Sequence, residues 1–503
     1  MSRQLNGPLF GLTSGFTLAF CIWALIDLTS LSEAVGAGFS TAVAVFGWAW
    51  QAGLLLVFLI SIGLAIHPAA RQIMGPVNKP EFSGFQWGSM IMCTLLAGGG
   101  VFWAAGEPMA HYLSPPPIFE TTTDTRQLAA QALAQSFMHW GFLAWSILGS
   151  LSALLLMDLH HNHGYPLAPR TLMAPLIGRT RTMGWMGTTI DAACIIAVVA
   201  GTVGPIGFLG LQVGFGLNAL LGMPNTLLTQ LSVILALVSL YTVSALSGVS
   251  KGIQLLSRLN ILLGVSLLFF MVVAGPTAHI VQGFGDGMLI YLSDFFKMAM
   301  YRADADWLGW WTVFFWGWFL GYGPMMAIFI ARISKGRSAR SMIVMVSIIA
   351  PLVTNVWFCI IGGTGLGLEL ENPGSVSTAF EGFNLPAALI AITQALPFGH
   401  VIGILFLILT SIFVATTGDS MTYVISVAMT RQEDPPPWLR VFWGVSMGIM
   451  AAVLLTAGES GVQSLQSFIV VTAVPVFFVL LPSIWCAPKQ LLQRWSQQKS
   501  TPH

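Results

Sequence analysis

Charge is what this 503-residue chain has least of. Only 8% of its residues are Asp, Glu, Lys or Arg, whereas 55% are hydrophobic and the mean hydropathy is +0.80. Because a soluble domain carries about 25% charged residues, the composition excludes an ordinary soluble protein. The formal net charge of +1 also argues against a nucleic-acid partner, which would need a clustered basic surface.

Cysteine, phosphate-binding motifs and convergent catalytic sets are scarce or absent as well. An odd, scattered set of five cysteines indicates neither a disulfide framework nor a zinc site. We find no phosphate loop of the Gly-Lys-Ser type, so ATP is not expected to drive the protein. No nucleophile, base and acid can be assembled, so we expect no enzyme and no cofactor. The histidines of HHNH at 160–163 lie in a loop without fixed geometry, and we expect no metal there.

What the chain does have is a series of long apolar runs. Several approach or exceed about 20 residues, the length that spans a bilayer as a helix. The start MSRQLNGPLFG lacks the features of a removable signal peptide, so the first run is expected to be the first span. We predict twelve spans, at roughly 10–32, 46–66, 86–106, 132–157, 183–213, 224–247, 252–275, 310–332, 341–365, 398–428, 437–458 and 464–486.

Two shorter apolar pieces are not expected to cross the membrane. The mixed segment 287–303 suits an interfacial helix, and residues 387–397 suit a half-helix before the tenth span. The chain then divides into five parts: an N-terminal two-helix segment (1–85), spans three to seven (86–275), a periplasmic loop (276–309), spans eight to twelve (310–486) and a short cytoplasmic tail (487–503).

The basic residues give the orientation of this topology. With an even number of spans and both termini in the cytoplasm, only Arg126, Lys297 and Arg302 of the 20 Lys and Arg residues fall outside. This asymmetry is what the positive-inside rule expects, and an odd number of spans would scramble it. We therefore predict a multi-pass protein of the inner membrane with both ends inside.

The stretch 310–340 stands out among the spans. It carries four tryptophans, and the letters GYGP at 321–324 fall near its middle. Proline removes a backbone donor and glycine permits non-helical geometry, so we expect the helix to break there. In a membrane, freed backbone groups persist only where they are buried or line a cavity. The predicted break is therefore a candidate binding site.

An aromatic stripe runs through the same stretch. Trp311, Phe315, Trp318 and Tyr322 follow spacings of four, three and four residues, which places them on one face of a helix. Stacked aromatic faces attract a cation that cannot donate hydrogen bonds, as a quaternary ammonium group cannot. The alternative is plain packing or an interfacial belt. Belts sit at helix ends, however, whereas two of these four rings are central.

This stretch resembles a known family. The letters WTVFFWGW at 311–318, followed by IARISKGRS at 330–338, are similar to the signature of the betaine/carnitine/choline transporter family. That signature has a Trp-Thr start, a Trp-x-Trp-Trp core and an Ala-Arg-Ile-Ser-(Arg/Lys)-Gly-Arg run. This chain departs from it at Phe319, which replaces the second Trp of the pair, and at Trp310, where a small or polar residue is usual.

The resemblance covers nearly the whole chain and implies a fold and a function. The fold is an all-α polytopic one, with about 12 transmembrane helices in a LeuT-like five-plus-five inverted repeat after two extra helices. Glycine-rich interruptions at 97–100 and 321–324, five spans apart, suggest the same two repeats. The implied function is secondary transport of glycine betaine, carnitine or choline by a homotrimer, with 287–303 as a contact. A sulfonium compound or an amino acid on the same scaffold is an alternative. A channel is less favoured because polar residues are scarce in the spans.

The resemblance also supplies a second wall for the binding site. The letters HWGFLAW at 139–145 match the family's His-Trp-Gly-x-x-x-Trp in the fourth span. Trp140 and Trp145 are five residues apart, about 140° around an ideal helix, so spacing alone does not pair them. Leu148 and Ala110 stand where some relatives have aromatic residues, which makes the box thinner. The predicted substrate-binding set is Trp140, Trp145, Trp311, Trp316, Trp318, Phe319, Tyr322 and Met326.

The letters VATTGDS at 414–420 resemble the tenth-span Thr-Ser-Ala-Asp-Ser of sodium-coupled members. Thr416 and Thr417 would supply hydroxyl ligands for a transported Na+, unless they only bond carbonyls of their own helix. Asn260 aligns with the arginine of sodium-independent carnitine antiporters, so we add it to the ion-binding set. Sodium coupling is favoured, with proton coupling or antiport of the carnitine/γ-butyrobetaine type as rivals.

Four acidic residues fall within or near the spans, where ionisable groups are expensive. Asp191 and Asp419 lie on core helices, and we expect a structural role for them, with proton relay as the alternative. Glu107 and Asp27 lie near span ends and are expected to reach water.

Overall fold

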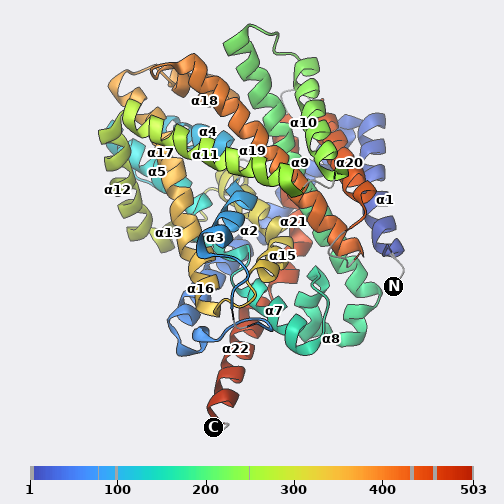
Figure 1. Ribbon diagram of the computed structural model, residues 1–503. Helices are drawn as coiled ribbons and strands as arrows, with labels where there is room; N and C mark the ends of the chain where they lie inside the picture. The colour runs from blue at the N-terminus through green and yellow to red at the C-terminus, as the bar shows by residue number, and fades with distance from the viewer. Residues whose placement is uncertain are drawn as a thin grey trace.

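The computed structural model describes residues 5–77, 79–96, 100–247, 250–430, 435–456 and 461–500. Within these ranges the chain forms helices and no strand, and the one isolated β-bridge joins Ile73 to Ser338. Figure 1 shows the helices packed into one bundle, with the C-terminal helix α22 projecting from its lower edge.

The N-terminal segment begins with two helices that meet at one residue. Helix α1 spans Gly7–Ile26 and α2 spans Leu28–Ile66. Asp27 lies between them, exposed as predicted, and its carboxylate accepts a hydrogen bond from the backbone N–H of Ser30. Because Asp27 caps α2, the helix starts 18 residues before the predicted second span at 46, which is a correction of the sequence-based boundary.

The third and fourth spans are assembled from several helices. After the short 3₁₀ helix η1 (Pro68–Arg71), the third span comprises α3 (Gly84–Leu96) and α4 (Gly100–Leu113). The glycine-rich interruption expected at 97–100 falls largely on residues 97–99, outside the described residues. The fourth span comprises α5 (Thr125–Trp140), α6 (Phe142–Ile147) and α7 (Leu151–His163).

The next elements complete the first half of the chain. They are η2 (Pro169–Met173), α8 (Ala174–Met183), α9 (Trp185–Leu221), α10 (Leu227–Ser247), α11 (Ser250–Ala274), α12 (Thr277–Ser293) and α13 (Phe295–Ala299). Helix α12 turns by 106° from the preceding helix and contains only the first part of the segment 287–303 that was predicted to be interfacial. The turned helix begins at Thr277, ten residues earlier than the predicted interfacial segment.

The second half is organised around α15. Its elements are α14 (Ala305–Leu308), the π-helix η3 (Gly309–Val313), α15 (Phe314–Ile333), α16 (Ala339–Val344), the π-helix η4 (Met345–Ile349), α17 (Ala350–Glu371), η5 (Ser377–Phe380), α18 (Leu385–Gln394), α19 (Gly399–Thr430), α20 (Pro437–Leu455), α21 (Gly461–Leu480) and α22 (Ser483–Ser500). The short helix α18 confirms the predicted half-helix at 387–397.

Among the described residues, nine helices are long and apolar enough to cross a membrane, or ten if the bent pair 258–274 and 277–293 counts as one span. The most enclosed are 125–163, 185–221 and 305–333, with 94%, 89% and 94% of their apolar windows buried, against 28% for α1. These three segments therefore form the centre of the molecule, and α1 lies at its periphery.

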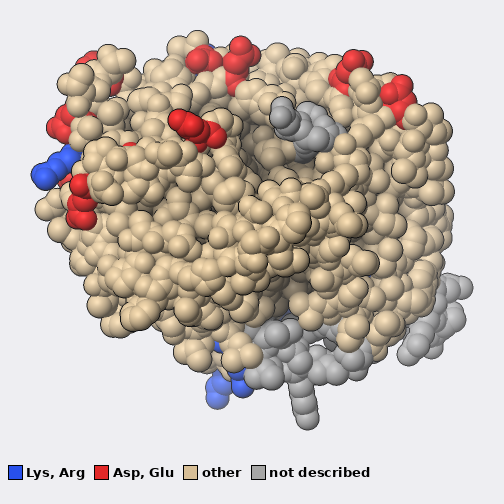
Figure 2. Space-filling model, turned by 90° about the horizontal axis from the view of Figure 1, so that it is seen from above, with Lys and Arg blue, Asp and Glu red and all other residues tan. Residues whose placement is uncertain are grey.

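The two ends of the bundle differ in charge. Figure 2 views the molecule from above Figure 1 and shows Asp and Glu around the rim of a hollowed face, with few Lys or Arg. The helix α22 at the opposite end carries Lys489, Arg494 and Lys499 and no acidic residue. This separation has the direction that the predicted topology requires.

Candidate functional site

Aromatic rings from three helices meet at the centre of the molecule. The ring of Trp140 on α5 lies 5.1, 5.9 and 5.5 Å between centroids from Phe315, Trp318 and Phe319 on α15. It lies 5.0 Å from Phe358 on α17. All five rings are at most 8% exposed, so they face protein and not the lipid-exposed surface. We call these five residues the aromatic cluster.

Helix α9 fixes the position of the α15 rings. The indole N–H of Trp318 donates to the backbone oxygen of Gly201 at 3.0 Å, and the Tyr322 hydroxyl lies 3.1 Å from Thr202 Oγ1. A Cβ atom on Gly201 would lie 2.7 Å from the Tyr322 ring, so a glycine is needed for this close approach. Since the polar atoms of both side chains bond to α9, a ligand would meet their ring faces.

The ring of Trp140 is held differently, by a carboxylate. Its indole N–H donates to Glu107 Oε2 at 2.7 Å, and His139 Nδ1 lies 2.6 Å from Glu107 Oε1. Glu107 is 0% exposed. The prediction that it reaches water is therefore wrong, because α4 continues to Leu113 and packs against α5 and α17.

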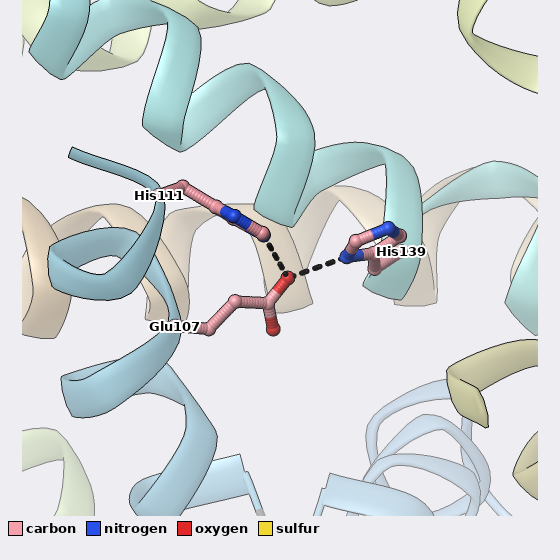
Figure 3. A group of neighbouring side chains, drawn as sticks. All are labelled: Glu107, His111 and His139. Carbon is pink, nitrogen blue, oxygen red and sulfur yellow. Dashed lines mark hydrogen bonds and ion pairs between the residues drawn. The ribbon is translucent and has the colours of Figure 1, made fainter. Parts of the chain in front are cut away.

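A second group of side chains lies next to this carboxylate. Figure 3 shows His111 and His139 converging on Glu107 from α4 and α5. His111 Nε2 lies 3.4 Å from Glu107 Oε1, and both histidines are at most 1% exposed. We call Glu107, His111 and His139 the Glu–His triad. The triad was not predicted, although the i, i+4 spacing of Glu107 and His111 on an apolar helix was a signal for it in the sequence.

The predicted break in the eighth span is absent. Residues 321–324 lie inside α15, which continues without interruption to Ile333. The glycines serve close packing instead: a Cβ on Gly323 would lie 2.8 Å from Leu480 Cδ1, and one on Gly321 would lie 3.6 Å from the Ala197 oxygen. The prediction was wrong because small residues in membrane helices also permit close helix contact. Because the interruption at 321–324 is absent, paired interruptions no longer support two repeats.

The break occurs in the fourth span, directly after Trp140. Gly141, with φ −94° and ψ −138°, separates α5 from α6. A Cβ atom at Gly141 would lie 2.1 Å from the Phe137 backbone oxygen and 2.8 Å from the Tyr291 hydroxyl. The backbone N–H of Phe142 donates to that hydroxyl at 3.1 Å. The freed amide is thus satisfied within the protein, as an interruption at membrane depth requires.

The structure brings only part of the predicted substrate set together. Trp140, Trp318 and Phe319 join the aromatic cluster, and Tyr322 packs beside Trp318 against Gly201. Trp311, in η3, is half-buried and lies 6.2 Å from Phe315 and 4.4 Å from His111.

Trp145, Trp316 and Met326 are buried, but no ring contact among the described residues joins either tryptophan to the aromatic cluster. Trp316 lies two residues from Trp318, about 200° around the helix, so the two point to different neighbours. The indole N–H groups of Trp145 and Trp316 have no hydrogen-bond partner among the described residues.

The predicted ion ligands are buried or half-buried but are not joined by hydrogen bonds. The hydroxyls of Thr416 and Thr417 both donate to the backbone oxygen of Phe413, at 2.8 and 3.1 Å. This is the helix-carbonyl alternative, although each hydroxyl oxygen keeps lone pairs that could accept a cation. Asn260 is 2% exposed, and its Oδ1 has no partner among the described residues.

The other intramembrane acids are paired with arginines. Asp191 accepts from the Arg170 backbone N–H at 2.7 Å and from its Nε at 2.6 Å. Asp419 accepts from Arg440. These pairs support the expected structural role, because a buried ion pair with added hydrogen bonds compensates the desolvation of both charges.

Comparison with known proteins shows which family the sequence matches. A family model described as "BCCT, betaine/carnitine/choline family transporter" matches residues 8–496. A glycine betaine transporter 2 of Vibrio parahaemolyticus is 55% identical over 96% of this chain and 90% of its own. The glycine betaine transporter OpuD of Bacillus subtilis is 31% identical over 94% and 92%. A betaine/ectoine transporter of Corynebacterium glutamicum is 32% identical over 95% of this chain and 76% of its own.

Proposed function

The chain belongs to the betaine/carnitine/choline transporter family, and we propose that it carries a quaternary-ammonium solute, with glycine betaine foremost. It is a multi-pass membrane transporter and not an enzyme. One observation carries the choice of solute class: Trp140 of the fourth span contacts Trp318 and Phe319 of the eighth in a buried, aromatic setting. Aromatic faces that converge from two helices are the usual recognition for a methylated cation.

Binding would require the rings to separate. The centroids of Trp140 and its neighbours are 5.0–5.9 Å apart, so the rings are in direct contact with one another. The interruption at Gly141 permits α5, which carries Trp140, to move relative to α6. We infer that this interruption acts as the hinge that opens the aromatic cluster during alternating access.

We further propose the five-plus-five inverted repeat for this scaffold. In such a repeat, spans three to seven correspond to spans eight to twelve. Three of the corresponding pairs are in contact, α5 with α17, α9 with α19 and α10 with α20, as expected around a pseudo-twofold axis. Cytoplasmic termini, an inner-membrane location and a homotrimer complete the proposal. The scarcity of Lys and Arg on the face in Figure 2, opposite the basic helix α22, supports the orientation, and the family resemblance supports the location and the trimer.

Sodium coupling through Thr416, Thr417 and Asn260 is part of the same proposal. The unpartnered Asn260 Oδ1 and the free lone pairs of the two hydroxyls are oxygen ligands that suit a hard cation. The rivals are a sodium-independent antiporter and a transporter of a sulfonium or amino-acid solute. The name of the Corynebacterium relative includes ectoine, an amino-acid derivative, so a solute of the amino-acid class stays an alternative.

The test is uptake of labelled glycine betaine into proteoliposomes, with and without a sodium gradient, in competition with choline, carnitine, a sulfonium analogue and ectoine. We expect saturable uptake that quaternary-ammonium compounds inhibit and that needs sodium. Uptake indifferent to replacing sodium with potassium would reject sodium coupling. Failure of every quaternary-ammonium compound to compete would reject the solute class.

A further inference from the structure

The Glu–His triad has the composition of a metal site. Glu107, His111 and His139 each offer one ligand atom, and the three atoms lie within 4.8 Å of one another. Figure 3 shows both imidazole rings turned toward the carboxylate. We propose that this triad binds a divalent transition-metal ion of the zinc class. The proposal does not depend on the identity of the transported solute.

The charge balance of the triad favours a cation. Among the described residues, the only ion-pair contacts of Glu107 are with the two histidines, and no Lys or Arg reaches it. Its other hydrogen-bonding neighbours, the Trp140 indole and the Ser136 hydroxyl, are neutral. A carboxylate that is fully removed from water and meets no Lys or Arg either takes up a proton or pairs with another cation. A bound cation would compensate this charge.

His111 supplies a second and independent observation. The side chain is 1% exposed, and neither of its ring nitrogens has a hydrogen-bond partner among the described residues. Buried polar groups are nearly always paired in native proteins. Its Nε2 nevertheless points toward Glu107 Oε1, 3.4 Å away, which is a contact and not a hydrogen bond. A metal ion between the two atoms would satisfy both.

The ligand types and spacing narrow the choice of metal. Two imidazoles and one carboxylate are typical of zinc, with water in the fourth position, whereas sodium and magnesium prefer oxygen ligands. Tetrahedral geometry with bonds of about 2.0–2.1 Å places ligand atoms about 3.3 Å apart. The His111–Glu107 separation of 3.4 Å already fits, and the His139–Glu107 separation of 2.6 Å must open.

The neighbours of His139 can serve as the outer shell. If Nδ1 binds the metal, Nε2 must carry the proton and donate it outward. Thr312 Oγ1 lies 3.0 Å from Nε2 and can accept. Gln135 Nε2 lies 2.9 Å away, and Gln135 Oε1 is buried without a partner. Rotation of the Gln135 amide would place its Oε1 atom beside His139 Nε2, where it could accept the hydrogen bond from the protonated nitrogen.

Access to the triad is controlled by two indoles. Trp311 and Trp307 lie 4.4 and 5.9 Å from the His111 ring, between centroids. Because these rings cover the histidines, we expect metal binding to be slow and to need a movement of η3 or α14. The protein must therefore be incubated with the metal until binding reaches equilibrium before the affinity is measured.

The experiment uses the full-length protein without an affinity tag, stripped with EDTA and titrated with Co²⁺, which reports tetrahedral coordination by its visible absorption. We expect one equivalent of Co²⁺, displaced by Zn²⁺. Glu107→Gln and His111→Ala should each weaken binding by at least about 100-fold, the upper range for loss of a mere outer-shell partner. The matched control is His161→Ala/His163→Ala, which removes histidines from the last turn of α7, where the structure has a helix instead of the expected loop, and should leave this binding unchanged.

Each outcome decides the proposal. Absence of stoichiometric Co²⁺ binding in the wild-type protein would overturn it. So would binding that is lost in the His161→Ala/His163→Ala control but retained in His111→Ala. If His111→Ala does not fold, the rise in melting temperature on adding Zn²⁺ is compared between the wild-type protein and Glu107→Gln. A rise that is larger in the wild-type protein supports the site, and an equal rise in both proteins overturns it. Glycine betaine binding measured in EDTA is a separate readout, so failure of the metal site and failure of the proposed function are distinguishable.

Discussion

The fourth and eighth spans each bring a tryptophan to the centre of the molecule, but they hold it by different means. Trp140 ends a helix that breaks at Gly141, and its N–H is held by the side chain of Glu107. Trp318 lies within an unbroken helix, and its N–H is held by the backbone oxygen of Gly201. In the proposed mechanism the Trp140 wall of the aromatic cluster is therefore the adjustable one, because it is held by a carboxylate beside the proposed hinge at Gly141. The other is fixed to a neighbouring helix backbone.

The largest expected effect tests the break itself. Gly141→Ala places a Cβ 2.1 Å from the backbone oxygen of Phe137 in the preceding helix α5, so the backbone at the break must change. We expect loss of the folded transporter, or a stability loss above about 4 kcal/mol, measured by thermal unfolding in detergent and by uptake. Gly321→Ala in the eighth span is the matched control, because its Cβ would meet only an ordinary contact at 3.6 Å. Equal damage by both substitutions would mean that the two spans do not differ in this way.

The next effect tests the two walls. Trp140→Ala and Trp318→Ala each remove an aromatic face from a desolvated cation, which is worth about 1–2 kcal/mol. We expect the apparent affinity for glycine betaine to fall roughly tenfold in each variant. Trp48→Ala, at a tryptophan that is 57% exposed on α2, is the control and should leave affinity unchanged. Unaltered uptake in either cluster variant would count against the aromatic site.

A smaller effect tests the adjustable wall. Glu107→Gln keeps the shape of the side chain but removes the charge that holds the Trp140 indole at 2.7 Å. A hydrogen bond to a charged group contributes about 1.5–3 kcal/mol, and the amide keeps part of it, so we expect roughly threefold to tenfold weaker affinity. Binding of a labelled betaine measures this. A positioning role predicts that Glu107→Ala is worse than Glu107→Gln, and identical losses would contradict it.

The smallest effect tests the fixed wall. Thr202→Val removes the hydroxyl 3.1 Å from Tyr322 without changing the backbone contact that holds Trp318. One neutral hydrogen bond contributes about 1 kcal/mol, so we expect at most about fivefold weaker affinity. Thr189→Val on the same helix α9, where the exposed hydroxyl bonds its own helix, is the matched control. If Thr202→Val lost more affinity for glycine betaine than Glu107→Gln, the Trp318 wall would depend on its side-chain contact more than the Trp140 wall does, which would contradict the comparison.

Much of the fold followed from local pattern. The apolar runs predicted most of the helices, including the short α18, because the length of an apolar run is itself the requirement for crossing a bilayer. The buried faces of Phe315, Trp318 and Tyr322 followed from helical spacing, and Trp140 from the family motif. The start of α2 was misplaced because Asp27 was not recognised as a cap. Contacts between residues far apart in the sequence could not be predicted from local pattern.

The sequence by itself determined that the protein consists of membrane helices and which rings share one face of the eighth span, since these depend on composition and on spacing along one helix. The transporter family followed from the resemblance of its motifs at 311–318 and 330–338. Only the tertiary structure decided which glycines interrupt a helix and which admit a neighbour. Gly141 and Gly323 look alike as letters, yet a backbone oxygen lies where the Cβ of the first would be, and a leucine side chain from α21 where that of the second would be. The Glu–His triad likewise exists because α4 and α5 pack together, bringing Glu107 and His139 to within 2.6 Å across 32 positions of sequence.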